Sequence, residues 1–181
     1  GMGLSGIGLW GSDIGGFFTL SDQRLTPEVL SRWIQFGAFS GVMRSKAEGI
    51  GVPLASRPQI WEEPTLPIWR RYAKLRTQLY PYLQAADADY RRTGMPIMRQ
   101  LALVYPDDRS ATGREEEFMF GDDLLVAPVL QPGATKRRLY LPRGRWVDFW
   151  KAVSYHPDEG GSFALGDAET MLHWDLATMM P

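Results

Sequence analysis

The chain has 181 residues, of which 44% are hydrophobic and 12% aromatic, enough to bury a sizeable core in one large or two small domains. Its formal net charge of -1 gives no electrostatic reason to expect nucleic acid or an anionic membrane as a partner, so we expect a neutral or small ligand. With no cysteine and two histidines, disulfides, thiolate chemistry and a Cys/His zinc site are excluded, and we expect neither a metal nor a cofactor.

The opening stretch predicts a glycine-rich strand over residues 3–9. Trp10 and Asp13 follow this strand, and the glycine pair at 15–16 then breaks any regular element. An acid at the end of a strand is a ligand-facing position in α/β barrels, so Asp13 is a candidate binding residue. The alternative is that Asp13 caps a turn through its own side chain.

A helix is predicted over residues 27–36, because the Thr-Pro-Glu sequence at 26–28 combines an N-cap residue, a first-turn proline and a first-turn acid. The apolar run 39–43 predicts a second strand that ends at two cations, Arg44 and Lys46. This repeated order indicates two units of a parallel barrel. Because closing such a barrel takes eight strands, we expect the chain to be a fragment.

Residues 47–67 are rich in proline and predict an irregular loop. Apolar residues at helical spacing then predict one long helix over residues 68–92, bent at Pro81. Gly94 is the expected C-cap, so we place a domain boundary there, between residues 1–94 and 95–181.

The second domain is predicted to be antiparallel β, with turn signals between its strands and a short helical turn at residues 114–120. Its expected strands cover residues 97–104, 124–129, 137–141 and 146–150.

Several motifs along the chain resemble landmarks of glycoside hydrolase family 31, the retaining α-glucosidase and α-xylosidase group, and they occur in the family's order. The stretch W-G-S-D-I-G-G-F, which contains Asp13, is similar to the family's seventh-strand motif. The other matches are R-W-I-Q-F-G-A-F at 32–39, Met43-Arg44, L-Y-P-Y-L at 79–83, P-I-M-R at 96–99, F-G-D-D-L-L-V-A-P-V at 120–129 and Y-L-P-R-G-R-W-V-D-F-W at 140–150.

The resemblance implies an α/β plus all-β fold: the last two βα units of a (β/α)8 barrel, followed by an antiparallel β-sandwich that is incomplete here. It also implies a retaining α-glycoside hydrolase, which uses two carboxylates about 5 to 5.5 Å apart. In the family both lie upstream of the Asp13 motif, so we expect no catalytic residue in this chain. The acidic pairs 107–108 and 122–123 are poor substitutes, since neighbours in a strand point to opposite faces, and the acids at 115–117 are expected to be a solvated helical start.

Residue-by-residue matching to the family assigns five substrate-binding residues. Asp13 falls on an aspartate that accepts hydrogen bonds from sugar hydroxyls, and Phe17 falls on an aromatic lining the same subsite. Trp10 is expected in the pocket wall, or alternatively buried in the barrel. Arg44 matches the arginine of an R-x-H motif whose histidine is replaced here by Lys46, a charge that would suit an acidic or otherwise modified sugar.

Two other functions stay open: a noncatalytic carbohydrate-binding or interaction module derived from such an enzyme, and a scaffold with no ligand. An incomplete sandwich would expose strand edges through which homo-oligomers could form. No run of about 18 apolar residues and no charged-then-apolar leader is present, so we expect a cytoplasmic protein with no membrane partner.

Overall fold

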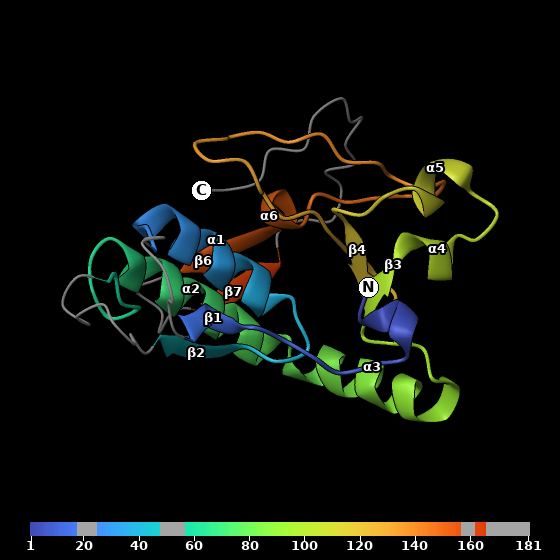
Figure 1. The fold of residues 1–181 in the computed structure, drawn as a ribbon, viewed down its shortest axis with the longest axis horizontal. Helices are drawn as coiled ribbons and strands as arrows, with labels where there is room; N and C mark the ends of the chain where they lie inside the picture. The colour runs from blue at the N-terminus through green and yellow to red at the C-terminus, as the bar shows by residue number, and fades with distance from the viewer. Residues whose placement is uncertain (18–24, 48–56, 157–161, 166–181) are drawn as a thin grey trace.

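The structure is a computed structural model that describes residues 1–17, 25–47, 57–156 and 162–165. Figure 1 shows the early strands lying beside long helices, while an antiparallel sheet and long connections make up the opposite side of the molecule. Within the described ranges, no helix is both long enough and apolar enough to cross a membrane.

Strands β1 (Asp13–Phe17) and β2 (Arg44–Ala47) form a parallel pair and are connected through helix α1 (Pro27–Ala38). The helix lies close to β1 because Gly37 has no side chain, and a Cβ there would come within 2.5 Å of Cδ1 of the fully buried Ile14. One parallel strand–helix–strand unit of the expected barrel is therefore present.

The expected strand over residues 3–9 is wrong. This segment begins with a 3-10 turn, η1 (Gly3–Ser5), and Leu4 and Leu9 are about half exposed at 55% and 50%. Strand β1 begins only at Asp13, the first residue that has a partner on β2. The carbonyl of Gly8 instead accepts a hydrogen bond from the Ile97 amide at 3.0 Å. This segment is therefore hydrogen-bonded to the later part of the chain and not to a neighbouring strand.

Helix α1 confirms the predicted start, because the Thr26 hydroxyl accepts a hydrogen bond from the Val29 amide at 3.2 Å. It runs two residues beyond the predicted end. The strand expected over residues 39–43 is wrong, since Phe39 closes the helix and the Ser40 hydroxyl donates to carbonyls on both sides of the turn, those of Gly37 and Val42.

The long helix expected over residues 68–92 is two helices, α2 (Thr65–Gln78) and α3 (Tyr80–Thr93), joined at Leu79. Pro81 lies in the first turn of α3, where its missing amide leaves no helical hydrogen bond unmade, so it starts a helix rather than bending one. Gly94 is confirmed as the C-cap, with φ 78° and its amide donating to the Tyr90 carbonyl at 2.8 Å.

The antiparallel prediction for the second half is confirmed by the sheet β3 (Met98–Gln100), β4 (Phe118–Phe120) and β5 (Leu124–Val126). The details differ: β3 gives way at once to α4 (Leu101–Val104), and α5 (Arg109–Thr112) follows. The helical turn expected at 114–120 is wrong, because its end forms the central strand β4, flanked on both sides.

Residues 137–141 and 146–150 do not form the expected strands; only Arg137 and Val147 make isolated bridges. Asp148 instead caps α6 (Phe149–Ala152), accepting a hydrogen bond from the Trp150 amide at 3.0 Å. The hairpin β6 (Val153–His156) and β7 (Ser162–Leu165) follows, and β7 contacts α2. In the described part of the chain, strands β3 to β5 form one three-stranded sheet, and β6 and β7 form a separate hairpin. This arrangement is less than the expected β-sandwich.

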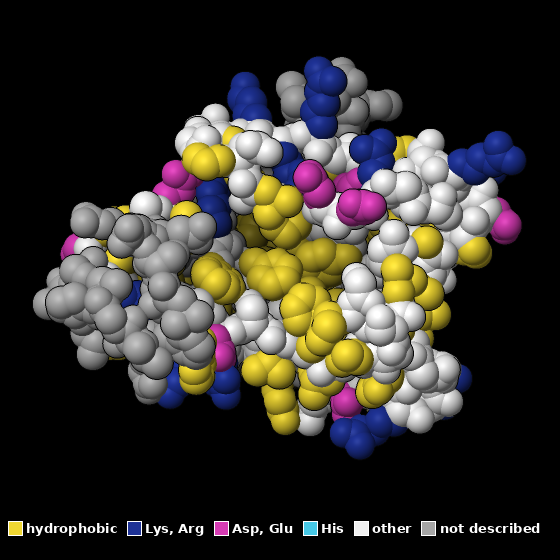
Figure 2. Space-filling model, in the orientation of Figure 1, with side chains coloured by type: hydrophobic (Ala, Val, Ile, Leu, Met, Phe, Trp, Pro, Cys, Tyr) yellow, Lys and Arg dark blue, Asp and Glu magenta, His cyan; other side chains and the backbone are white. Residues whose placement is uncertain are grey.

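One core cluster draws on both halves of the chain. The Phe39 ring contacts those of Phe120, Phe149 and Trp150 nearly edge-on, each with ring centroids 6.2 Å apart. Hydrophobic side chains also gather in a hollow at the centre of the face in Figure 2, between α1 and the sheet. The domain boundary at Gly94 stays a prediction, because buried residues from before and after Gly94 belong to the same core cluster.

Candidate functional site

Asp13 and Arg44 stand opposite each other as the first residues of the two parallel strands. The Arg44 Nε donates to Asp13 Oδ1 at 2.7 Å, and a second guanidinium nitrogen contacts the same oxygen. The Arg44 side chain is 62% exposed and that of Asp13 22%, so the pair faces solvent. The expectation that Asp13 and Arg44 end their strands is wrong: pairing of the two strands begins at these residues.

Phe17 and Lys46 form a second contact further along the same strands. The Lys46 Nζ lies 5.3 Å from the centroid of the Phe17 ring, a cation–π geometry. Asp13 and Phe17 are four residues apart on β1, a span of roughly 13 Å in an extended strand. The structure thus brings the predicted residues together as two pairs, one at each end of the strands.

Trp10 lies apart from both pairs. Its ring packs against Phe36 of α1 with centroids 6.2 Å apart, and its carbonyl accepts a hydrogen bond from the Val42 amide at 3.1 Å. Its indole nitrogen is buried and has no hydrogen-bond partner among the described residues. This position agrees with the alternative of a packed barrel tryptophan, while its role in a pocket wall stays a prediction.

Two residues that position this segment were missed from the sequence. The Ser12 hydroxyl accepts a hydrogen bond from the Trp33 indole at 2.7 Å, and the buried Arg57 guanidinium donates to the Gly15 carbonyl. Gly16 has φ 81°, and a Cβ there would lie 3.2 Å from the Trp33 ring. A lone serine and an arginine within a proline-rich stretch carry no sequence signal for these contacts.

Several of the other acids have structural partners. Asp108 caps α5 and accepts a hydrogen bond from the Tyr140 hydroxyl at 2.7 Å, which lowers the pKa of its carboxyl. Asp122 pairs with the buried Arg99. In the parts of the chain described, no group of three or more acidic, histidine or cysteine side chains is arranged to hold a metal ion.

Glu117 corrects the expectation of a solvated helical start at 115–117. Its side chain is buried, and its carboxylate accepts hydrogen bonds from the Tyr140 amide at 3.1 and 3.2 Å. Burial raises the pKa of this carboxyl, and the Tyr140 amide and the Arg114 guanidinium partly offset the rise. This buried, hydrogen-bonded carboxylate therefore connects the residue that precedes β4 to the backbone at Tyr140.

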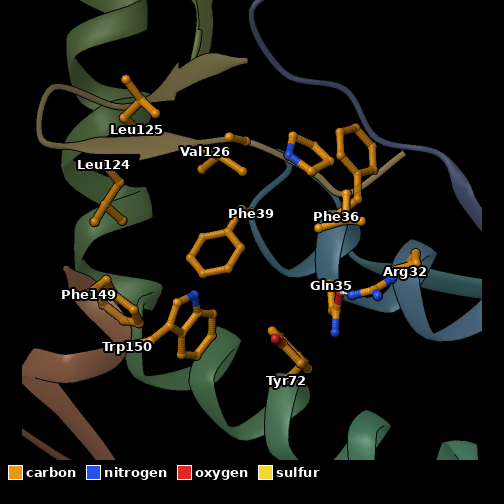
Figure 3. A pocket seen from close by; sticks show the side chains of 13 residues that line it. Arg32, Gln35, Phe36, Phe39, Tyr72, Leu124, Leu125, Val126, Phe149 and Trp150 are labelled. Carbon is orange, nitrogen blue, oxygen red and sulfur yellow. Dashed lines mark hydrogen bonds between the residues drawn. The ribbon is translucent and has the colours of Figure 1, made fainter. Parts of the chain in front are cut away.

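A small cavity of about 70 Å³ lies where α1, α2, β5 and α6 meet. Figure 3 shows Phe39, Tyr72 and Trp150 pointing toward it, with Arg32 and Gln35 at one side. Burial raises the pKa of the Tyr72 hydroxyl to about 12, so this side chain is neutral. The cavity is a gap in the shared core and contains none of the five predicted binding residues.

Two family models match the chain in succession. The Glycosyl hydrolases family 31 TIM-barrel domain matches residues 1–86, and the Glycosyl hydrolase family 31 C-terminal domain matches residues 94–174. The chain belongs to glycoside hydrolase family 31. The Asp13–Arg44 strand pair thus falls in the barrel part of this family, and the sheet of β3, β4 and β5 in its C-terminal domain.

Individual family 31 proteins give the same result. Alpha-glucosidase 2 of Bacillus thermoamyloliquefaciens is 37% identical to this chain, in an alignment that covers 94% of this chain and 21% of the relative. The sulfoquinovosidase of Escherichia coli is 36% identical, in an alignment that covers 87% of this chain and 23% of the relative. The solved cycloalternan-forming enzyme of Listeria monocytogenes, in complex with a pentasaccharide substrate, superposes with a TM-score of 0.73 at 32% identity, over 94% of this chain and 16% of its own. The chain therefore spans about a fifth of the length of these relatives.

Proposed function

We propose that this chain supplies part of the sugar-binding subsite of a retaining α-glycoside hydrolase that breaks O-glycosyl bonds in carbohydrate metabolism. Membership of family 31 supports this class of reaction, and the Asp13–Arg44 pair is the observation that carries the proposal. Both contacts from Arg44 go to Oδ1. Among the described residues nothing donates to Oδ2, so this oxygen is available to accept a sugar hydroxyl.

Arg44 then acts as a positioning residue. Its guanidinium holds the Asp13 side chain through two contacts to Oδ1, and a charged acceptor makes the stronger hydrogen bond to a hydroxyl. The Phe17 ring offers an apolar face for the carbon-bound hydrogens of a sugar ring.

The chemistry of a retaining glycosidase requires a nucleophile and an acid/base about 5 to 5.5 Å apart. The 181 residues contain no motif that resembles either of the family's catalytic segments. The isolated chain is accordingly expected to hydrolyse no aryl α-glycoside, and turnover by the purified chain would overturn this part of the proposal. The decisive assay uses the protein from the complete reading frame on a panel of α-linked sugars.

Lys46 supports a narrower proposal, in which the substrate is an acidic sugar. The name of one relative, a sulfoquinovosidase, is in keeping with an anionic substrate, although another is an alpha-glucosidase. Lys46→His in the complete protein should shift the ratio of kcat/KM between an acidic and a neutral α-glycoside toward the neutral one. An unchanged ratio would show that Lys46 does not discriminate between acidic and neutral substrates.

The competing function is a noncatalytic sugar-binding module. It is distinguished by the reading frame upstream of residue 1: two in-frame carboxylate motifs support the enzyme, whereas their absence combined with sugar binding supports the module. A scaffold without ligand is favoured if no sugar changes the thermal stability of the chain.

A further inference from the structure

A larger open groove, of about 550 Å³, lies in the second half of the chain and includes none of the five residues at the β1–β2 pair. Its lining comes from the turn that joins β4 to β5 and from the segment that leads into α6. Figure 1 shows where β4 and α6 lie in the fold. Its volume is within the range of ligand clefts, about 300 to 1,000 Å³. We propose that this groove is a second, noncatalytic carbohydrate site that binds neutral oligosaccharides.

The groove has an aromatic lining that is fixed in place. Tyr105, Trp146, Phe149 and Trp150 all contribute to it. The Trp146 indole donates to the Pro142 carbonyl at 2.8 Å, which satisfies its polar atom and fixes the plane of the ring. Aromatic rings held in this way offer flat apolar faces at low entropic cost, and the carbon-bound hydrogens of a pyranose stack on such faces.

The backbone of one side of the rim is also held in place. The Tyr82 hydroxyl donates to the Phe120 carbonyl at 2.7 Å and accepts from the Asp123 amide at 2.9 Å, so the turn between β4 and β5 is held from α3. Gly121, with φ 64°, allows the approach, because a Cβ there would lie 2.4 Å from the Tyr82 hydroxyl oxygen. The neighbouring Asp122 is held by the buried Arg99.

The charges of the rim favour a neutral ligand rich in hydroxyl groups. The groove is lined by both carboxylates and guanidinium groups, including Asp123 and Arg143. Within the described residues, neither of these two side chains has a hydrogen bond or ion pair. A carboxylate accepts hydroxyl hydrogens and a guanidinium donates to hydroxyl oxygens, whereas an anionic or cationic ligand would meet one repulsive partner.

The test measures the binding of maltoheptaose and of an isomalto-oligosaccharide to the 181-residue chain. Binding is monitored through the tryptophan indole signals in NMR spectra and by calorimetry. We expect the Trp146 signal to shift, and Asp123→Asn with Arg143→Met to weaken binding roughly tenfold, or about 1.4 kcal/mol. These two side chains are exposed, so the double variant should fold. Trp61→Ala, which removes a tryptophan that is 65% exposed and outside the groove, is the matched control and should bind normally.

A further variant distinguishes sugar binding at this groove from sugar binding at the subsite that contains Asp13. Asp13→Asn should leave binding at the groove unchanged. If Asp13→Asn abolished all binding while the double variant at the rim did not weaken it, the groove proposal would be overturned and the first subsite supported. Absence of any sugar binding, or a response to an apolar peptide in place of sugar, would also overturn it.

Discussion

The Arg44 guanidinium contacts a single carboxylate oxygen of Asp13, and it does so from the directly opposite position on a parallel strand. The arrangement depends on register: Arg44 reaches Oδ1 because the two residues are the first pair of the ladder. A shift of one residue would turn one side chain to the other face of the strand. The same pairing that builds the fold thus orients the proposed sugar acceptor.

Asp13→Ala should affect function far more than stability. In the complete protein, kcat/KM should fall by a factor that corresponds to about 2 to 4 kcal/mol, because a charged hydrogen-bond acceptor is lost from the subsite. The free energy of unfolding should change by less than about 1 kcal/mol, because the ion pair is solvent-exposed. A lower melting temperature with intact kinetics would show that Asp13 only caps the turn.

Gly37→Ala should destabilise the protein by about 1 to 3 kcal/mol, the cost of overpacking a core. The added Cβ would lie 2.5 Å from Ile14 Cδ1, which is fully buried and has little room to move. Gly113→Ala is the control, since the nearest atom there would be 3.9 Å away. Chemical denaturation measures both, and equal effects would show that α1 can shift away from β1.

Arg99→Met should lower the free energy of unfolding by about 1.5 to 3 kcal/mol, through loss of charged hydrogen bonds to Asp89 and Asp122. Arg92→Ala is the matched control. Arg92 also contacts Asp89, but its side chain is 75% exposed against 4% for Arg99, so its loss should cost less than about 1 kcal/mol. Comparable losses in urea titrations would contradict a dominant role for the buried arginine.

Glu117→Gln should change how stability depends on pH. Burial raises the folded pKa of the Glu117 carboxyl above its ordinary 4.5, so the folded state holds this proton more tightly than the unfolded state. The resulting contribution to stability is complete below the unfolded pKa and is lost as pH rises through the folded pKa. The wild type should therefore lose this contribution in that window, and the variant should not.

The measurement for Glu117 is the free energy of unfolding at several pH values from about 4 to 7. Glu116→Gln, in a neighbour whose side chain is 64% exposed, controls for the removal of one negative charge. Identical pH profiles for Glu117→Gln and the wild type would show that hydrogen bonds from Tyr140 cancel the effect of burial.

Local signals predicted the start of α1 and the end of α3 well, and the strand limits poorly. Thr26 and Gly94 act through their own side chain or backbone, so the sequence is enough to place them. A strand begins where a partner is available, which is why β1 begins at Asp13 and not among the earlier apolar residues. The same reason explains residues 137–141, which are apolar in part but make one isolated bridge.

The candidate site was predicted by type of residue but not by arrangement. Family resemblance selected Asp13, Phe17, Arg44 and Lys46, and the structure pairs them two by two. Ser12 and Arg57 could not be found, because their partners are 21 and 42 residues away and reach them only through the fold.

Helix α1 ends at carbonyl groups that are satisfied by a residue of another helix. The Arg76 guanidinium of α2 donates to the carbonyls of Ala38, at 3.1 Å, Ser40 and Gly41. The segment that leads from α1 into β2 therefore depends on a cap supplied from 35 or more residues downstream. A shortened variant that retains β1, α1 and β2 but stops before α2 would lack these donors. The shortest fragment that keeps the Asp13–Arg44 pair in place must therefore extend through Arg76.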